Sequence, residues 1–165
     1  EEFILSNEKF LIFTSFTKSI EQLSELFKRI FHIPVYKIYG GTDIDDRQNL
    51  IDKFTDDRGA GCMILNPAVG SAGLNIVCAN HVIHYNLEWN PAVIDQASAR
   101  SYRLGQEKNV TVHYLIYANS IESYIYDRLE QKKQMAEDTI IGVQSKLEID
   151  DIVNNYLLKE GLKND

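Results

Sequence analysis

FLIFTSFTKSIEQLSELFKRIFHIPVYKIYGG, residues 10–41, contains two apolar segments of strand character with a helical segment between them. Residues 10–14 are expected to form a buried strand, and residues 35–39 a second strand that ends at Gly40-Gly41. Residues 19–31 have the three- and four-residue apolar spacing of an amphipathic helix, which is carried by Ile20, Leu23, Leu26, Phe27 and Ile30. This order of elements predicts a right-handed βαβ unit with parallel strands.

The same alternation continues along the chain. Further strands are expected at residues 62–65, 81–85 and 110–116, and further helices at about residues 45–55, 90–105, 120–136 and 147–158. Asn90-Pro91 is a good start for the helix at residues 90–105, and Gly105 is a good end for it. The pattern predicts an α/β fold, with a mostly parallel sheet flanked by helices on both faces and extra C-terminal helices.

The expected domain organisation is a main lobe at residues 1–142 and a helical appendage or tail at residues 143–165. The first residues, EEFILSNEKF, are expected to enter a strand almost at once. Because this start has no initiator Met, the chain is expected to be a piece of a longer protein. Functional loops of a parallel sheet lie beyond the carboxyl ends of its strands, so the loops at residues 15–18, 40–43, 66–75 and 86–91 are the places to look for function.

The bulk composition limits the classes of function. The 165 residues are 44% hydrophobic and 25% charged, as expected for one soluble globular domain. The net charge of −7 argues against a surface that coats nucleic acid generally, but it permits a small local anion site. The apolar runs are too short to span a membrane and no export leader is visible, so no membrane partner and a cytoplasmic location are expected. Cys62 and Cys78 are expected to be reduced thiols, and no metal site is expected.

Several catalytic motifs are missing from the sequence. No Gly-Lys pair occurs, so the chain lacks the G-x-x-x-x-G-K-[ST] loop that cradles nucleotide phosphates. No G-x-S-x-G nucleophile motif occurs either. The GSAG stretch at residues 70–73 is too short to replace the phosphate loop. A complete ATPase is therefore excluded.

DQASARSYRLGQ, residues 95–106, places Gln96, Arg100 and Arg103 four and then three residues apart. On a helix these side chains fall within about 60° of one another. The apolar side of the same helix is expected to consist of Ile94, Ala97, Ser101 and Leu104. One interpretation is that the arginine pair binds an anion that a partner supplies. The alternative is an exposed helix whose arginines pair with nearby carboxylates or water.

Four stretches together resemble one family: KFLIFTSF (9–16), YGGTDIDDRQNLIDKF (39–54), NPAVGSAGLNIVCANHVIHYNLEWNPA (66–92) and DQASARSYRLGQ (95–106). Their order and spacing are similar to those of the C-terminal, RecA-like motor lobe of superfamily 2 helicases. The Trp-Asn-Pro sequence followed by Q-A-x-x-R-x-x-R-x-G-Q narrows the resemblance to the Swi/Snf-type DNA translocases. The resemblance covers roughly residues 9–142.

The resemblance implies the second lobe of an ATP-driven double-stranded DNA translocase. ATP and Mg²⁺ would be bound mainly by an N-terminal lobe of the same polypeptide, so this chain alone is expected to hydrolyse nothing. Arg100 and Arg103 would be arginine fingers that reach the γ-phosphate across the cleft, with Gln96 helping to position the phosphate or the fingers. Gly70 and Gly73 would let the backbone approach the nucleotide closely, with a strand-to-helix turn that needs small residues as the competing interpretation. Asn75 would contact the nucleotide ribose or the lobe interface. If the source is bacterial, a nucleoid-associated location is expected.

The resemblance also implies contacts with the DNA backbone, for which the candidates are Thr14, Ser15, Thr42 and Asn66. Ordinary turn capping is the competing interpretation, above all for Thr42. Relatives usually have a Ser-Thr pair and a basic residue where this chain has Asn66-Pro67-Ala68, which removes a hydroxyl and a cation. Two alternative functions stay open at this point: a non-catalytic interaction domain that kept the motor fold, and the lobe of a strand-separating helicase.

Overall fold

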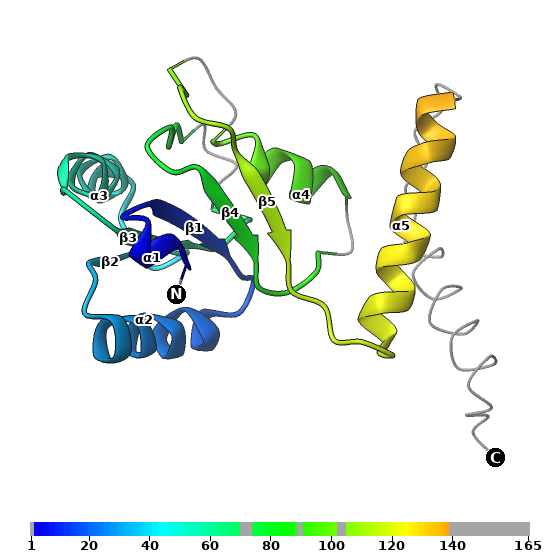
Figure 1. Ribbon diagram of the computed structural model, residues 1–165, viewed down its shortest axis with the longest axis horizontal. Coiled ribbons are helices and arrows are strands. Elements are labelled where there is room, and N and C mark those ends of the chain that lie inside the picture. Colours follow the sequence, from blue (N-terminus) through cyan, green and yellow to red (C-terminus); the bar gives the residue numbers. More distant parts are fainter. Residues whose placement is uncertain (1, 70–73, 89–90, 102–104, 139–165) are drawn as a thin grey trace. The chain divides into compact units, whose positions relative to one another are not determined.

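A computed structural model of the chain describes residues 2–69, 74–88, 91–101 and 105–138 (Figure 1). The chain divides into two units, a sheet unit that extends to Leu115 and a second unit that begins at Ile116. The predicted domain boundary at residue 142 and the predicted helix at residues 147–158 lie outside the described residues.

The sheet unit is built on five parallel strands in the order β2-β3-β1-β4-β5. These strands are β1 (Lys9–Phe13), β2 (Val35–Ile38), β3 (Gly61–Leu65), β4 (His81–His84) and β5 (Thr111–Tyr114). The parallel α/β sheet predicted from the sequence is confirmed. The chain steps away from β1 to form β2, returns to form β3 beside β1, and then crosses to form β4 on the other side of β1.

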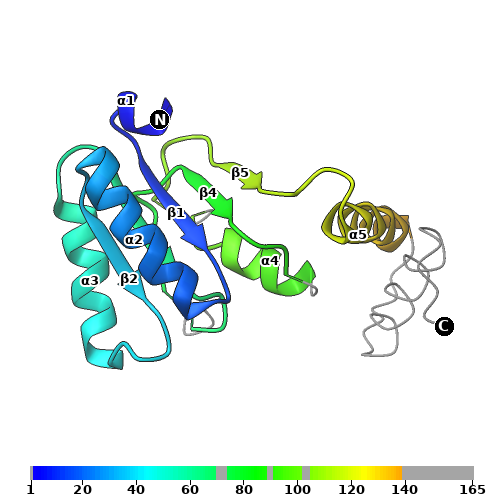
Figure 2. The same cartoon turned by 90° about the horizontal axis from the view of Figure 1, so that it is seen from below.

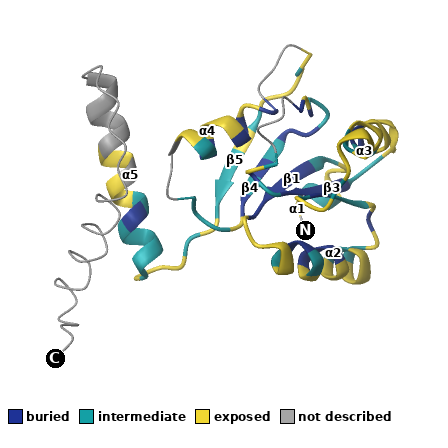
Figure 3. Cartoon of the chain, turned by 180° about the vertical axis from the view of Figure 1, so that it is seen from behind, coloured by how far each residue is buried: buried dark blue, intermediate teal, exposed yellow. Residues whose placement is uncertain are grey.

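Helices cover both faces of the sheet, as predicted. Figure 2 shows α2 (Thr17–Phe31) lying across one face of the sheet, while Figure 1 shows α3 (Ile44–Asp56) and α4 (Pro91–Ser98) on the opposite face. Residues of one strand point alternately to the two faces. In β1, Phe10 and Ile12 therefore pack on the α2 side, and Leu11 and Phe13 on the α3 side. Figure 3 shows the resulting buried centre of the sheet.

The start of the chain differs from the prediction. A short helix, α1 (Glu2–Leu5), precedes β1 where the sequence predicted early entry into a strand. The strand predicted from residue 10 is confirmed as β1, and the apolar residues of EEFIL before it belong to a helical turn. The Phe3 ring stacks on the ring of His81 with centroids 4.0 Å apart, which fixes α1 near the amino end of β4.

The end of α4 also differs from the prediction. The predicted helix runs to Gly105, but α4 ends at Ser98. The next amides form tighter i→i−3 bonds, from Arg100 N–H to the Ala97 carbonyl (3.2 Å) and from Ser101 N–H to the Ser98 carbonyl (3.1 Å). Side chains in such a turn advance by about 120° per residue instead of 100°. The helical spacing used for Arg100 therefore does not hold.

The second unit contains α5 (Ile121–Asp138), close to the predicted helix. Its first turn is fixed by reciprocal bonds between Ser120 and Ser123, in which each backbone N–H donates to the other's hydroxyl oxygen (3.2 and 3.3 Å). Within the described parts of the chain, no helix is long and apolar enough to cross a membrane. The same residues contain no group of three potential metal ligands of the His, Cys, Asp and Glu types.

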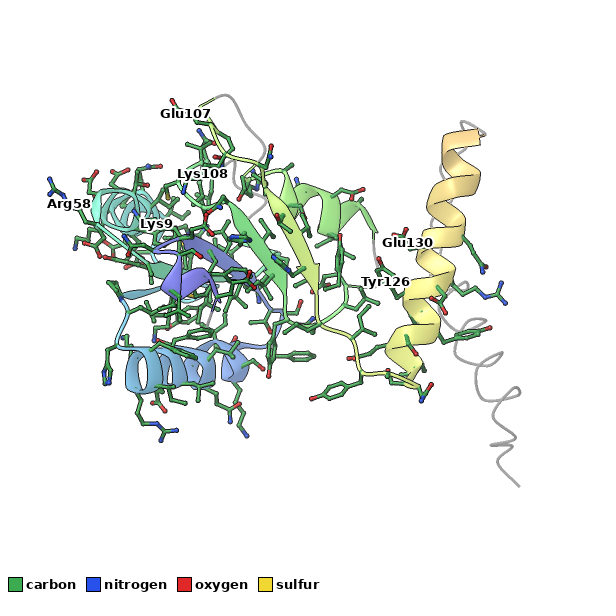
Figure 4. All side chains as sticks on the ribbon, in the orientation of Figure 1. Lys9, Arg58, Glu107, Lys108, Tyr126 and Glu130 are labelled. Carbon is green, nitrogen blue, oxygen red and sulfur yellow. The ribbon has the colours of Figure 1, made fainter. Side chains whose placement is uncertain are left out.

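A polar cluster joins the amino ends of β1, β4 and β5. Glu8 accepts hydrogen bonds from the Asn80 amide (2.8 Å) and from His81 Nε2 (2.8 Å), and Lys108 Nζ lies 3.7 Å from its carboxylate. Figure 4 labels Lys108 at this end of the sheet. The hydrogen bond from His81, followed by that from Asn80, lowers the pKa of the Glu8 carboxyl below 4.5.

We expect Glu8→Ala to lower the free energy of unfolding by about 1–3 kcal/mol at pH 7, because it leaves the buried Asn80 amide without its acceptor. The folded-state pKa of Glu8 is lowered, so its contribution is present above pH 4.5 and is lost as the pH falls through the folded pKa. Urea unfolding at pH 7 and at pH 3 measures both effects. A Glu8→Ala deficit that is equally large at pH 3 would contradict the ionic part of the prediction.

Candidate functional site

The candidate site lies at the carboxyl edge of the sheet. Because β1 lies between β3 and β4, the loops that follow these three strands start side by side. The Thr14 amide continues the ladder to the Leu65 carbonyl (3.0 Å), and the Tyr85 amide continues it to the Phe13 carbonyl (2.9 Å). This is the point where the chain reverses its direction across the sheet, and such points commonly bind ligands.

Ser15 is the centre of a hydrogen-bond network that connects the three loops. Its backbone N–H donates to Asn86 Oδ1 (3.1 Å), and its carbonyl accepts from Asn66 Nδ2 (3.1 Å). Its hydroxyl donates to Glu88 Oε1, which also accepts from Asn86 Nδ2 (3.4 Å). The structure therefore brings together the predicted candidates Ser15 and Asn66. It adds Asn86 and Glu88, which the sequence did not single out although their loop was marked for attention.

The hydroxyl groups of Thr14 and Thr42 both form hydrogen bonds with backbone amides of their own loops. Thr14 is fully buried, and its Oγ1 accepts a hydrogen bond from the Phe16 amide (3.4 Å). Thr42 Oγ1 accepts from the Tyr39 amide (3.1 Å), and the Thr42 carbonyl accepts two bonds from the Arg47 guanidinium (3.2 Å each). These are the contacts of a capped turn after β2. A DNA contact by either threonine stays a prediction.

Gln96 and Arg100 do not share one exposed face. Gln96 is exposed, whereas only 3% of Arg100 is accessible to solvent. Arg100 Nη1 donates to the Leu74 carbonyl (3.4 Å), and the Arg100 carbonyl accepts from the Ile76 amide (3.2 Å). The prediction of an exposed arginine pair at helical spacing is wrong for Arg100, because the tight turn after Ser98 rotates it inward. Its role as an arginine finger stays a prediction.

The turn at Arg100 connects α4 to the loop that precedes β4. Asn75 lies in this loop between the two residues that bond to Arg100, and its side chain is exposed. The residues expected on the apolar side of this helix are buried where they are described: Ile94 and Ala97 lie in α4, and Ser101 lies in the turn after it. Gly70, Gly73, Arg103 and Leu104 lie outside the described residues.

His84 connects α4 to the sheet. It is 1% exposed, and its ring lies between those of Phe13 (5.7 Å) and Tyr114 (5.2 Å), nearly parallel to both. His84 Nε2 is 3.0 Å from the hydroxyl of Ser98 at the end of α4. Burial lowers the pKa of His84 to about 4, with a smaller opposing effect from Asp95. His84 is therefore neutral at pH 7, as a structural strand histidine is expected to be.

Signals for the added residues were present in the sequence. Asn86 and Glu88 are polar residues placed directly after an apolar strand, at the edge where functional loops gather. The sequence did not reveal that β1 lies between β3 and β4. This strand order is the reason why Ser15, which follows β1, contacts the loops that follow β3 and β4. The pairing of His84 with Ser98, fourteen residues away, has a different cause, because it arises where α4 packs back against the strand that precedes it.

Comparison with known proteins identifies the class of this lobe. Residues 1–105 match the family described as the helicase conserved C-terminal domain. Candidate helicase/translocase YwqA of Bacillus subtilis is 40% identical over 135 residues, which are 82% of this chain and 14% of YwqA. The ATP-dependent helicase FUN30 of Saccharomyces cerevisiae is 37% identical over 139 residues, 84% of this chain and 12% of FUN30. The chain thus spans less than a sixth of either relative.

Two solved structures have the same fold. The C-terminal part of the Fun30 ATPase domain aligns with a TM-score of 0.72 and 37% identity, covering 76% of this chain and 40% of that one. The Swi2/Snf2 ATPase core of Sulfolobus solfataricus aligns with a TM-score of 0.70 and 29% identity, covering 92% of this chain and 32% of that one. The chain belongs to the helicase C-terminal domain family, and its relatives are Swi/Snf-type ATP-dependent helicases. The RecA-like lobe expected from the sequence is confirmed.

Proposed function

We propose that this chain is the second, C-terminal lobe of an ATP-dependent motor that moves along double-stranded DNA. The observation that carries the proposal is the network at the carboxyl edge of the sheet, in a fold shared with Swi/Snf ATPase cores. There Ser15, Asn66 and Asn86 join three adjacent loops. Short polar groups and backbone amides of this kind suit the DNA backbone, which a motor without sequence preference has to hold.

In the proposed motor, ATP and Mg²⁺ are bound mainly by an N-terminal lobe of the same polypeptide. The absence of a Gly-Lys phosphate loop from this sequence supports this assignment of nucleotide binding to the other lobe. This lobe would supply Arg103 and Arg100 to the γ-phosphate, with Gln96 and Asn75 as exposed polar groups at the interface between the lobes. Because Arg100 is turned toward Leu74, Arg103 is the better candidate for the direct contact. Closure of the lobes would complete the catalytic site.

ATP hydrolysis with and without duplex DNA tests the proposal. The two-lobe protein, meaning this chain together with its N-terminal lobe, is expected to hydrolyse ATP faster when duplex DNA is added. The 165-residue chain alone is expected to hydrolyse none, because half of the site is elsewhere. A two-lobe protein that hydrolyses no ATP would favour the alternative of a non-catalytic interaction domain. Hydrolysis without any response to DNA would contradict a DNA-dependent motor.

A second assay separates translocation from strand separation. A translocase is expected to displace a third strand from a DNA triplex while the underlying duplex stays paired. A strand-separating helicase would instead release single strands from a duplex of the same length. Release of single strands without displacement of the third strand would replace the translocase proposal by the helicase alternative.

A further inference from the structure

Glu88 occupies an unusual position for an acidic residue. Its Oε1 accepts hydrogen bonds from the Ser15 hydroxyl and from Asn86 Nδ2, so one anionic oxygen lies where donors of two loops converge. Ser15 is itself fixed by its amide bond to Asn86 and by the bond from Asn66 to its carbonyl. The donors are therefore held in place around the carboxylate.

A carboxylate oxygen and a phosphate oxygen are interchangeable for such donors. Both are anionic acceptors, and both form short, strong bonds with hydroxyl and amide groups. The Ser15 hydroxyl has one proton to donate, so it cannot serve Glu88 and a DNA phosphate at once. A phosphate that approaches Ser15 also meets a negative charge at contact distance.

We propose that Glu88 is an intramolecular substitute for a DNA backbone phosphate and that it regulates how tightly this lobe binds DNA. Without DNA, the carboxylate holds Ser15 and Asn86. When the backbone binds, a phosphate takes the Ser15 hydroxyl and Glu88 moves into the solvent. This competition lowers the affinity for DNA and makes the contact readily reversible. The inference rests on the proposed function, because it requires the carboxyl edge to bind DNA.

The decisive variant is Glu88→Gln in the two-lobe protein. The introduced glutamine keeps the side-chain length and an acceptor oxygen for Ser15, but it removes the charge. Glu107→Gln is the matched control, since Glu107 is exposed and lies in the segment before β5, at the opposite edge of the sheet (Figure 4). Both variants change the net charge by the same amount, so only the local contact differs.

Duplex DNA affinity is measured for the wild type and both variants at about 0.1 M and 0.3 M salt. Glu88→Gln is expected to bind about fivefold tighter than Glu107→Gln, the size typical of a charge contact at a surface. The difference should persist at the higher salt, because charges in contact are screened less than distant ones. Equal affinities for the two variants would overturn the role of Glu88 and leave the proposed function intact.

A second comparison uses Ser15→Ala, which removes the hydroxyl for which carboxylate and phosphate compete. In this background, Glu88→Gln is expected to raise the affinity by clearly less than fivefold, because the competition no longer exists and only the repulsion between the carboxylate and the phosphate remains. A full gain of about fivefold in the Ser15→Ala background would mean that Glu88 repels DNA without this hydroxyl and would overturn the substitution model. Absence of duplex binding by the wild type at either salt would overturn the proposed function and this inference together.

Discussion

Arg103→Ala in the two-lobe protein is expected to lower DNA-stimulated ATP hydrolysis by roughly three orders of magnitude, the size seen for arginine fingers in phosphoryl transfer. A guanidinium carries a permanent positive charge in a planar fork, which suits the charge that develops on the transferring phosphoryl oxygens. ATP binding should be nearly unchanged, because in the proposed two-lobe motor the N-terminal lobe would hold most of the nucleotide. Steady-state hydrolysis and equilibrium binding of a fluorescent ATP analogue measure the two quantities separately.

Arg58→Ala is the matched control for the loss of one arginine. Arg58 is exposed just after α3, and Figure 4 shows it at the periphery of the sheet unit. Its replacement should leave hydrolysis within about twofold of the wild type, as is usual for exposed residues outside a site. If Arg103→Ala and Arg58→Ala had the same activity, the finger assignment of Arg103 would be wrong.

Arg100→Ala is expected to change both the stability and the activity of the two-lobe protein, unlike Arg103→Ala. It is buried against the Leu74 carbonyl, so its replacement disturbs the connection between α4 and the preceding loop. The thermal stability of Arg100→Ala should therefore fall together with its activity. Arg103→Ala should lose activity at unchanged stability if Arg103 acts on the phosphate directly.

The stability of the sheet unit is expected to fall by on the order of 3 kcal/mol between pH 6.5 and pH 4 because of His84. Burial lowers the folded-state pKa of His84 to about 4, while the unfolded value is 6.5. Between these values the unfolded chain binds a proton that the folded chain does not bind, so acid favours unfolding. Above pH 6.5 both states are neutral, and below pH 4 both are protonated, so the change is confined to that window.

His84→Phe isolates this effect. The introduced phenylalanine keeps an aromatic ring between Phe13 and Tyr114, but it cannot take up a proton. Urea unfolding at pH 7 and pH 4.5 should show a much smaller loss of stability for the variant than for the wild type. The amino-edge histidines, His81 and His113, are present in both proteins and cancel in the comparison. Equal losses in both proteins would show that His84 does not control the acid response.

The sequence predicted most of the fold because the fold depends on local patterns. The alternation of strands and helices, and the apolar character of β1 and β3, are properties of adjacent residues, and they were sufficient to indicate a parallel sheet covered on both faces. The ends of elements were less predictable. Helical spacing continued through residues 99–104 in the sequence, but the amides of Arg100 and Ser101 bond three residues back and end α4 early.

The candidate site was predictable only in part. Ser15 and Asn66 were identified through the resemblance to Swi/Snf-type motors, because each closely follows a buried strand. Asn86 and Glu88 were missed because nothing near them in the sequence marks them as partners of Ser15. Their role depends on the strand order, which places β4 beside β1 although β2 and β3 intervene in the chain.

The sequence by itself determined the class of fold, the family and the absence of a phosphate-binding Gly-Lys loop, because all three follow from the types of residues and their spacing along the chain. The tertiary structure alone decided which groups meet. It turned Arg100 inward onto Leu74, placed His84 against Ser98, and put the Glu88 carboxylate on the Ser15 hydroxyl. These contacts join residues between 14 and 73 positions apart, and such distant pairs are brought together only when the crossovers of the sheet are formed.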